Sequence, residues 1–205
     1  AIKIVKGLGV RVFSFIDVKG TVLEKESDYC INYSENEQLK FYMVANRLMY
    51  NNGEFPDYDQ YNKEMEESLA EALVDVEIKA DAFAEEFAAA KYKYVKAHPE
   101  MPHYFVGAGN QYGSTYSYAM CYWEEQMWIR TKSISSPEFF HGMLEVIEAE
   151  TPVVLFMGED EQRKTSERVA AFLPKVCRNY VIIDSKDYEL KGISEKFRGS
   201  ISHLV

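Results

Sequence analysis

Cysteine is scarce in this 205-residue sequence, and its three copies form no recognisable site. Cys30, Cys121 and Cys177 are far apart, and none stands in a CxxC or other metal-ligand spacing. An odd number of isolated cysteines argues against a disulfide framework. Because each lies in an apolar or aromatic run, we expect three small buried hydrophobic residues in a reducing compartment.

Long hydrophobic runs are also missing. No apolar run reaches the roughly 18 residues that a membrane-spanning helix needs, and no signal peptide is visible. We therefore expect a cytoplasmic protein with no membrane partner. Apolar residues still make up 47% of the chain, so a substantial core can form without disulfides or a structural metal.

Positive charge is in deficit, with a formal net charge of -10. A polyphosphate surface would repel such a chain, which argues against a nucleic-acid partner. A small phosphorylated ligand remains compatible, because one phosphate needs only a few local donors and a helix N-terminus can supply them.

Both ends of the sequence have unusual patterns. Residues 1–9 are typical of the last turns of a helix and its glycine cap, while residues 200–205 stop inside an apolar run. We therefore expect further residues beyond each end.

Strand and helix patterns alternate along the chain, which indicates an α/β fold with a parallel sheet and helices on both faces. The long segment 58–97 is rich in helix formers without glycine or proline, and predicts one or two long helices. The remaining patterns predict strands at 10–16, 29–33, 103–108, 132–135, 152–158 and 179–184, and helices at 37–51, 114–129, 137–148 and 161–173.

The loop Gly107-Ala-Gly109-Asn-Gln-Tyr-Gly113 follows a predicted strand and opens a helix. That is the setting of a dinucleotide-binding turn, but the spacing is GxGxxxG, and no acidic residue ends a following strand to hold a ribose. We favour a tight turn that lets the helix pack on the sheet, or one that cradles a phosphate.

The next helix has an aromatic and methionine stripe, which predicts packing against the sheet: Tyr112, Tyr116, Met120, Trp123 and Met127. A neighbouring face places a carboxylate beside Cys121 and Tyr122. Partial burial would raise the pKa of such a carboxylate and suit it to proton transfer. The pattern does not choose Glu125 over Glu124, and an ordinary surface carboxylate remains the alternative.

His141 follows a Ser-Ser-Pro turn and stands three residues after Glu138. If this segment is helical, the carboxylate and the imidazole share a face, so Glu138 can orient His141. An ordinary packed histidine is the alternative. A metal site at ExxH lacks the further ligands that a di-metal bundle needs. Arg163 and Glu167 read as an i,i+4 pair on a solvated helix.

Two runs, GAGNQYGSTYSYAMCYWEEQMWIRTKSISSPEFFHGMLEVIE and TPVVLFMGEDEQRKTSERVAAF, resemble the second half of sugar isomerase (SIS) proteins. The resemblance is to the fructosamine-6-phosphate deglycases, and more distantly to the isomerase domain of glucosamine-6-phosphate synthase. It implies a Rossmann-like three-layer αβα fold with long connecting helices. By this resemblance, residues 1–35 end a first SIS domain, 36–98 form a helical connector, and 99–205 form most of a second SIS domain.

The family's diagnostic element is a Glu sixteen residues before the His of a G-E-F-x-H-G-P segment. Glu125 and His141 have this spacing, so the resemblance selects Glu125 over Glu124. Pro137 replaces the usual Gly and Met143 replaces the usual Pro, and these two departures bear on the identity of the substrate more than on the chemistry. The candidate substrate-binding residues are Glu138, Gly109, Tyr112 and Ser114.

The resemblance implies cleavage of a 6-phosphorylated fructosamine to glucose 6-phosphate and a free amino acid, without a metal or redox cofactor. His141 would assist opening of the sugar ring, and Glu125 would move a proton from C1 to C2. The site would lie near the interface of a homo-oligomer, and the family's phosphate-binding loop would precede Ala1. The alternatives are another SIS isomerase or synthase, and a non-catalytic SIS module that senses a sugar phosphate.

Overall fold

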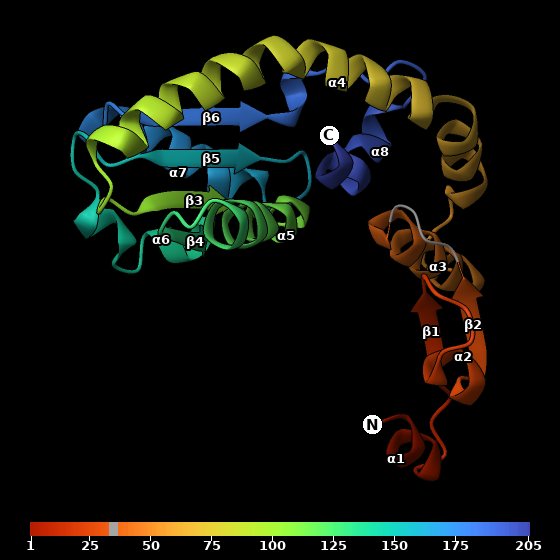
Figure 1. Ribbon diagram of the computed structural model, residues 1–205. Coiled ribbons are helices and arrows are strands. Elements are labelled where there is room, and N and C mark those ends of the chain that lie inside the picture. Colours follow the sequence, from red (N-terminus) through yellow and green to blue (C-terminus); the bar gives the residue numbers. More distant parts are fainter. Residues whose placement is uncertain (33–36) are drawn as a thin grey trace. The chain divides into compact units, whose positions relative to one another are not determined.

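The computed structural model of the protein describes residues 1–32 and 37–205. The chain forms two compact units, Ala1–Asp59 and Gln60–Val205, whose elements are labelled in Figure 1.

The first unit is a small α/β arrangement. Strands β1 and β2 pair in parallel, with Phe13 opposite Tyr29, and the Phe15 ring lies 4.4 Å from that of Phe41 on a following helix. The predicted strand end at Tyr33 lies outside the described residues. The elements of this unit are α1 (Ile2–Gly7), β1 (Phe13–Ile16), α2 (Val22–Glu26), β2 (Tyr29–Asn32) and α3 (Glu37–Asn51).

The three cysteines are free thiols, but the expectation that all are buried is wrong for Cys30, which is exposed. Cys30 pairs in register with Ser14, one residue from Phe15. Side chains alternate along a strand, so Cys30 points away from the face on which Phe15 meets α3. Cys121 is half-buried and Cys177 is buried.

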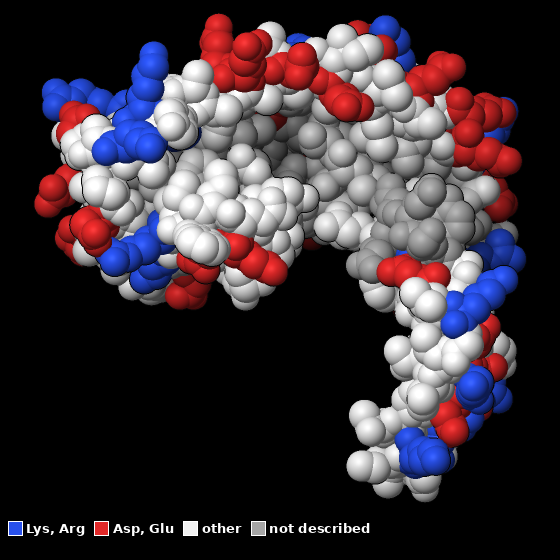
Figure 2. Space-filling model, viewed as in Figure 1, with Lys and Arg blue, Asp and Glu red and all other residues white. Residues whose placement is uncertain are grey.

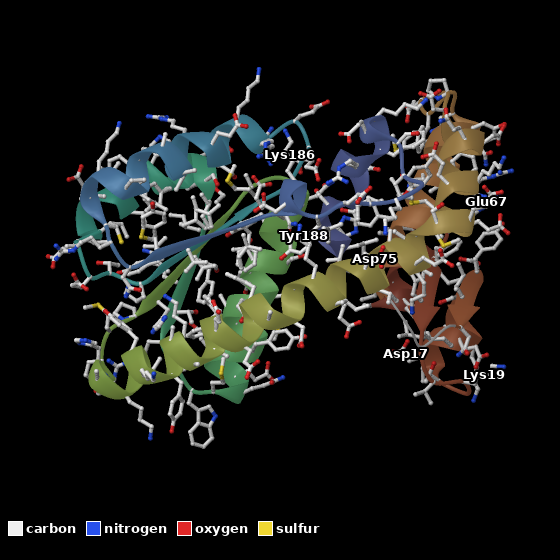
Figure 3. The ribbon with its side chains drawn as sticks, turned by 90° about the horizontal axis from the view of Figure 1, so that it is seen from above. Asp17, Lys19, Glu67, Asp75, Lys186 and Tyr188 are labelled. Atoms are coloured by element: carbon white, nitrogen blue, oxygen red, sulfur yellow. The ribbon has the colours of Figure 1, made fainter. Side chains whose placement is uncertain are left out.

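Helix α4 (Tyr58–Ala97) is one uninterrupted helix of 40 residues. Figure 2 shows Asp and Glu along its exposed side, and Lys at the C-terminal end, where positive charge favours the helix dipole. The segment after the last strand is held to the middle of α4: Lys191 Nζ lies 3.0 Å from the Asp75 carboxylate, and Lys79 lies over the Tyr188 ring (Figure 3). No helix within the described residues combines the length and apolar character needed to span a membrane.

The second unit contains a four-stranded parallel sheet in the order β4-β3-β5-β6. Its strands are β3 (His103–Gly107), β4 (Thr131–Ser135), β5 (Val153–Met157) and β6 (Tyr180–Asp184). All four strands were expected from the sequence, as was their parallel direction. Helices cover both faces, so the predicted three-layer α/β architecture is confirmed.

Alternate residues of the strands face the two helical layers. Phe105 and Val154 pack with Trp123 and the side of α4 that carries Phe87, on one face. Val106 and Leu155 pack on the other face, with helices α6 (Ser136–Phe139), η2 (Met143–Val146) and α7 (Arg163–Val176). The chain ends with η3 (Ser185–Asp187), α8 (Glu195–Ile201) and η4 (Ser202–Leu204).

The helix expected at 114–129 differs in start and in type. It begins as α5 (Asn110–Ser117) and continues as a π-helix, η1 (Tyr118–Gln126). The buried face begins at Thr115 and not at Tyr116, so it is already one residue out of phase with the expected stripe within α5. Thr115, Ala119 and Trp123 face the core, whereas Tyr116, Met120 and Met127 are exposed, so the core-packing prediction is wrong for those three.

The helix expected at 137–148 is also broken into two short pieces, α6 and η2. Gly142 lies between them with a φ of +122°, a backbone conformation that glycine adopts readily and other residues avoid. His141 therefore lies in a turn and not on a continuous helix.

Candidate active site

The strand order reverses direction between β3 and β5, and in parallel α/β sheets ligands bind outside the carboxyl ends of the strands at such a point. Gly109 and Asn110 follow β3 there and begin α5. The anion position at this helix N-terminus holds the protein's own Asp160, whose Oδ2 accepts a hydrogen bond of 2.6 Å from the Asn110 N–H. This carboxylate satisfies the helix dipole where a phosphate would otherwise bind.

Gly109 is required for this contact. Its φ is +56°, and a Cβ atom added there would lie 2.1 Å from the Asp160 carboxylate. Gly109, which faces Asp160, therefore permits close packing, which was one of the two favoured interpretations.

The chain's last segment packs against the same loop. Asn110 Nδ2 donates to the Gly199 carbonyl at 2.9 Å, the Gln111 side chain donates to the Ser202 carbonyl, and Ser114 Oγ donates to the His203 carbonyl at 3.4 Å. Of the predicted substrate-binding residues, Ser114 thus meets η4, and Tyr112 is half-buried at the first turn of α5.

Two ion pairs at this edge were not expected from the sequence. The Arg198 guanidinium lies 2.7 Å from the Glu159 carboxylate, and both side chains are buried. Arg163 forms its expected pair with Glu167 at 3.1 Å, and also binds both oxygens of Asp184 at 2.8 and 2.6 Å. Asp184 ends the predicted strand 179–184, so the expectation that no acidic residue ends a following strand is wrong, and Arg163 holds this carboxylate.

These pairs hold the loops in place. Burial acts to raise the pKa of the Asp184 carboxyl, but the hydrogen bonds from Arg163 and from the Lys186 N–H, together with the positive charges of both residues, hold this pKa below its usual value. The same interaction raises the pKa of Arg163. Both groups remain charged, and each provides the hydrogen-bond partners of the other. Their role is therefore to hold the loops at the carboxyl ends of the strands in place.

Glu125 lies near the C-terminal end of η1, and its side chain is exposed. The preceding residue, Glu124, is engaged differently: its Oε1 accepts hydrogen bonds from the Thr131 hydroxyl at 2.6 Å and the Thr131 N–H at 3.2 Å. The sequence pattern alone could not choose between these two glutamates. In the structure, Glu124 forms hydrogen bonds with the start of β4, and the Glu125 side chain is exposed to solvent.

His141 is exposed in the turn after α6. Its backbone N–H donates to the Glu138 carbonyl at 2.8 Å, and its Nδ1 lies 4.0 Å from Glu138 Oε1. The two side chains thus lie near each other in a turn and not on a continuous helix, and the orienting role of Glu138 stays a prediction. Next to His141, the Phe140 ring stacks under the Arg168 guanidinium, whose Cζ lies 3.8 Å from the ring centroid.

Both departures from the family segment fit this local structure. Pro137 occupies the first turn of α6, where a proline is tolerated because that N–H has no helical partner. Met143 is buried in the core on the α7 side of the sheet.

Glu125 and His141 are carried by elements on opposite faces of the sheet. Glu125 belongs to η1, which packs beside Phe105 and Val154, and His141 follows α6, which packs on the other face. Within the described residues, no hydrogen bond or ion pair joins the two side chains. Nor do these residues include any group of three or more His, Cys, Asp or Glu side chains that could hold a metal ion.

The sequence is similar to that of two deglycases, although no family model matches it. Fructosamine deglycase FrlB of Bacillus subtilis (strain 168) is 32% identical over 114 residues, which are 55% of this chain and 35% of that protein. Fructoselysine 6-phosphate deglycase of Escherichia coli (strain K12) is 35% identical over 81 residues, which are 40% of this chain and 24% of that protein. The expected resemblance to the fructosamine deglycases is therefore confirmed.

Solved structures share the fold. A Bacillus subtilis protein assigned as a phosphosugar isomerase superposes with a TM-score of 0.84 at 22% identity, covering 99% of this chain and 62% of that one. The C-terminal domain of glucosamine-fructose-6-phosphate aminotransferase from Francisella tularensis gives 0.67 at 14% identity, covering 99% and 63%. The expected SIS-type fold is thus confirmed. The match spans about a third or less of the curated relatives and under two thirds of the solved chains.

Proposed function

We propose that this protein is a deglycase that converts a 6-phosphorylated fructosamine and water into glucose 6-phosphate and a free amino acid. The observation that carries the proposal is the sequence identity with deglycases from two organisms, at 32% and 35%. The spacing of Glu125 and His141 supports their assignment as the catalytic residues, with Glu138 orienting His141.

The proposed chemistry is a proton shift followed by hydrolysis. His141 moves a proton to or from the ring oxygen and opens the sugar. Glu125 removes a proton from C1 of the open ketosamine to give an enolamine, and a proton returned to C2 gives an imine at C1. Water adds to that imine, the C–N bond breaks, and the amino acid leaves with its nitrogen. A carboxylate base and a positioned imidazole suffice for these steps.

We further propose that a complete site combines Glu125 of one copy with His141 of a second copy. The placement of these residues on opposite faces of the sheet supports this arrangement. Exposed apolar side chains on α5, on η1 and at the residue that ends η1 also support an interface there, namely Tyr116, Met120, Tyr122 and Met127. The proposed substrate is a small sugar phosphate, and we expect the protein to act in the cytoplasm.

Turnover of several 6-phosphorylated Amadori compounds, measured by coupled oxidation of released glucose 6-phosphate, tests the proposal. We expect release from at least one of them. Conversion of fructose 6-phosphate without cleavage of any fructosamine would instead assign a sugar-phosphate isomerase or synthase. Tight sugar-phosphate binding with no turnover would assign a sensor.

A further inference from the structure

The C-terminal end of α4 lies at the amino ends of the strands and is held there by a single stripe of side chains (Figure 1). From Phe87 to the end of the helix, only Phe87, Lys91, Tyr94 and Val95 are buried or half-buried, and every other residue is exposed. Phe87 and Val95 pack against the core on this face of the sheet. A helix end with so few buried contacts can open without the rest of the molecule.

His103, at the start of β3, contacts this stripe. Its ring centroid is 5.8 Å from that of Tyr94 on α4 and 4.7 Å from that of Trp123 on η1. The residue is 1% exposed, and neither ring nitrogen has a hydrogen-bond partner within the described residues. A neutral imidazole tolerates such a position better than an imidazolium, which brings two N–H donors and a charge into a place without water.

The polar groups that face His103 cannot neutralise that charge. On α4, the buried Lys91 ammonium donates to Asn179 Oδ1 at 3.2 Å, and its positive charge opposes a second one on His103. On η1, the indole N–H of Trp123 is a donor and has no acceptor among the described residues. In the same part of the chain, no carboxylate forms an ion pair or hydrogen bond with His103.

The remaining titratable groups at this edge are neutral or paired with each other. The Tyr94 hydroxyl and the Cys177 thiol donate to backbone carbonyls at 2.6 and 3.1 Å, and burial raises the pKa of both, so both stay neutral. His98 is exposed, with its ring centroid 4.5 Å from that of Tyr94. Two ion pairs engage the charged side chains near this edge, Glu150 with Arg178 and Glu100 with Arg130.

We propose that the contact between His103 and α4 is an acid-sensitive switch, which releases the last three turns of the helix while the sheet stays folded. Protonation of His103 places a second positive charge beside Lys91. Trp123 belongs to the core, whereas the stripe on α4 is the neighbour with the fewest buried contacts, so the helix end is what yields. Opening lets water reach the imidazolium. The switch does not involve Glu125 or His141, so it is independent of the proposed function.

The lowered pKa of His103 gives the expected size of the effect. Burial, with a smaller effect from Lys91, lowers this pKa to about 4, and in the opened state the imidazole regains a pKa near 6.5. The opened state therefore binds more protons than the closed state between about pH 6.5 and pH 4. Its population should rise about 20-fold between pH 7 and pH 5.

Hydrogen exchange of the backbone amides tests the switch, measured by mass spectrometry on the whole protein at pH 7 and pH 5 and corrected for the intrinsic exchange rate. We expect the protection of residues 87–97 to be about 20-fold lower at pH 5. Urea well below the unfolding transition should leave it unchanged, because local opening exposes little surface. Equal protection of this segment and of β5, with the same urea dependence, would show opening by global unfolding alone. That result, or no loss of protection at pH 5, would overturn the proposal.

Variants assign the effect to the imidazole. His103→Phe keeps an aromatic ring at this position but cannot be protonated, so the protection of residues 87–97 should become nearly independent of pH. Lys91→Met removes the neighbouring charge and should reduce the change below 20-fold without abolishing it. The control His98→Gln removes the exposed histidine beside Tyr94 and should keep the full change. An undiminished pH effect in His103→Phe, or its loss in His98→Gln, would contradict the assignment.

Discussion

His103 is buried to 1% exposure at the start of β3, and neither ring nitrogen has a hydrogen-bond partner among the residues that the structure describes. Its ring lies 4.7 Å from that of Trp123 and 5.8 Å from that of Tyr94. Burial, with a smaller effect from the nearby Lys91, lowers the pKa of His103 to about 4. The imidazole is therefore held neutral in the core, at the amino edge of the sheet and remote from the carboxyl edge.

This residue predicts acid sensitivity. The unfolded state has a histidine pKa near 6.5, so it binds more protons than the folded state between about pH 6.5 and pH 4. Stability should therefore fall as the pH drops through that window. His203, whose pKa burial also lowers to about 4, adds to the same effect.

His103→Leu should reduce this dependence, because it removes the proton that unfolding takes up. Urea unfolding between pH 4.5 and pH 7 measures the slope, which we expect to decrease by up to about one proton. Parallel stability profiles of the variant and the original protein would show that His103 does not titrate in this way.

At the scale of elements, the strands and α4 could be predicted because they have strong, simple periods. The π-helix could not, and neither could the buried face, which starts one residue earlier than the expected stripe and leaves Met120 at the surface. The break between α6 and η2 depends on the positive φ of Gly142. A glycine in the sequence allows a positive φ but does not require it, so the break could not be predicted.

Site residues show the same division. The sequence spacing could relate Glu138 to His141, and their 4.0 Å contact agrees with it. It could not show that Asp160 reaches the start of α5, because that contact joins loops 50 residues apart. The catalytic roles of Glu125 and His141 remain predictions from the family segment.

Gly109→Ala tests the loop at the start of α5. The added Cβ would strike Asp160, and the backbone would be strained at a positive φ, so we expect a loss of about 2 kcal/mol or more in unfolding free energy. Denaturant unfolding measures it.

Gly113→Ala is the matched control in the same helix. A Cβ there meets no atom of the described residues within 4 Å and Gly113 has no positive φ, so the variant should be neutral or up to about 1 kcal/mol more stable. Equal destabilisation of the two variants would contradict the role of Asp160 at Gly109.

At the scale of the whole molecule, the proposed active site spans two copies. Glu125 and His141 lie on opposite faces of one sheet, and an acid–base pair must reach the same sugar. A twofold dimer would bring the Glu125 of each copy to the His141 of the other.

Mixing two inactive variants tests this arrangement. Glu125→Gln and His141→Ala homodimers should each be inactive, whereas a mixed dimer has one site with both native residues. Random exchange of subunits should restore about a quarter of the original activity. Complete failure to complement, with mixed dimers demonstrated, would place both residues in one chain's site.

The central claim is that Glu125 is the base of a fructosamine-6-phosphate deglycase. The most direct measurement is release of glucose 6-phosphate by the original protein, by Glu125→Gln and by Glu161→Gln, an exposed glutamate that serves as control. We predict that Glu125→Gln lowers kcat by about 10²–10⁴-fold with an unchanged unfolding transition, and that Glu161→Gln is as active as the original. Near-normal turnover by Glu125→Gln would contradict the claim.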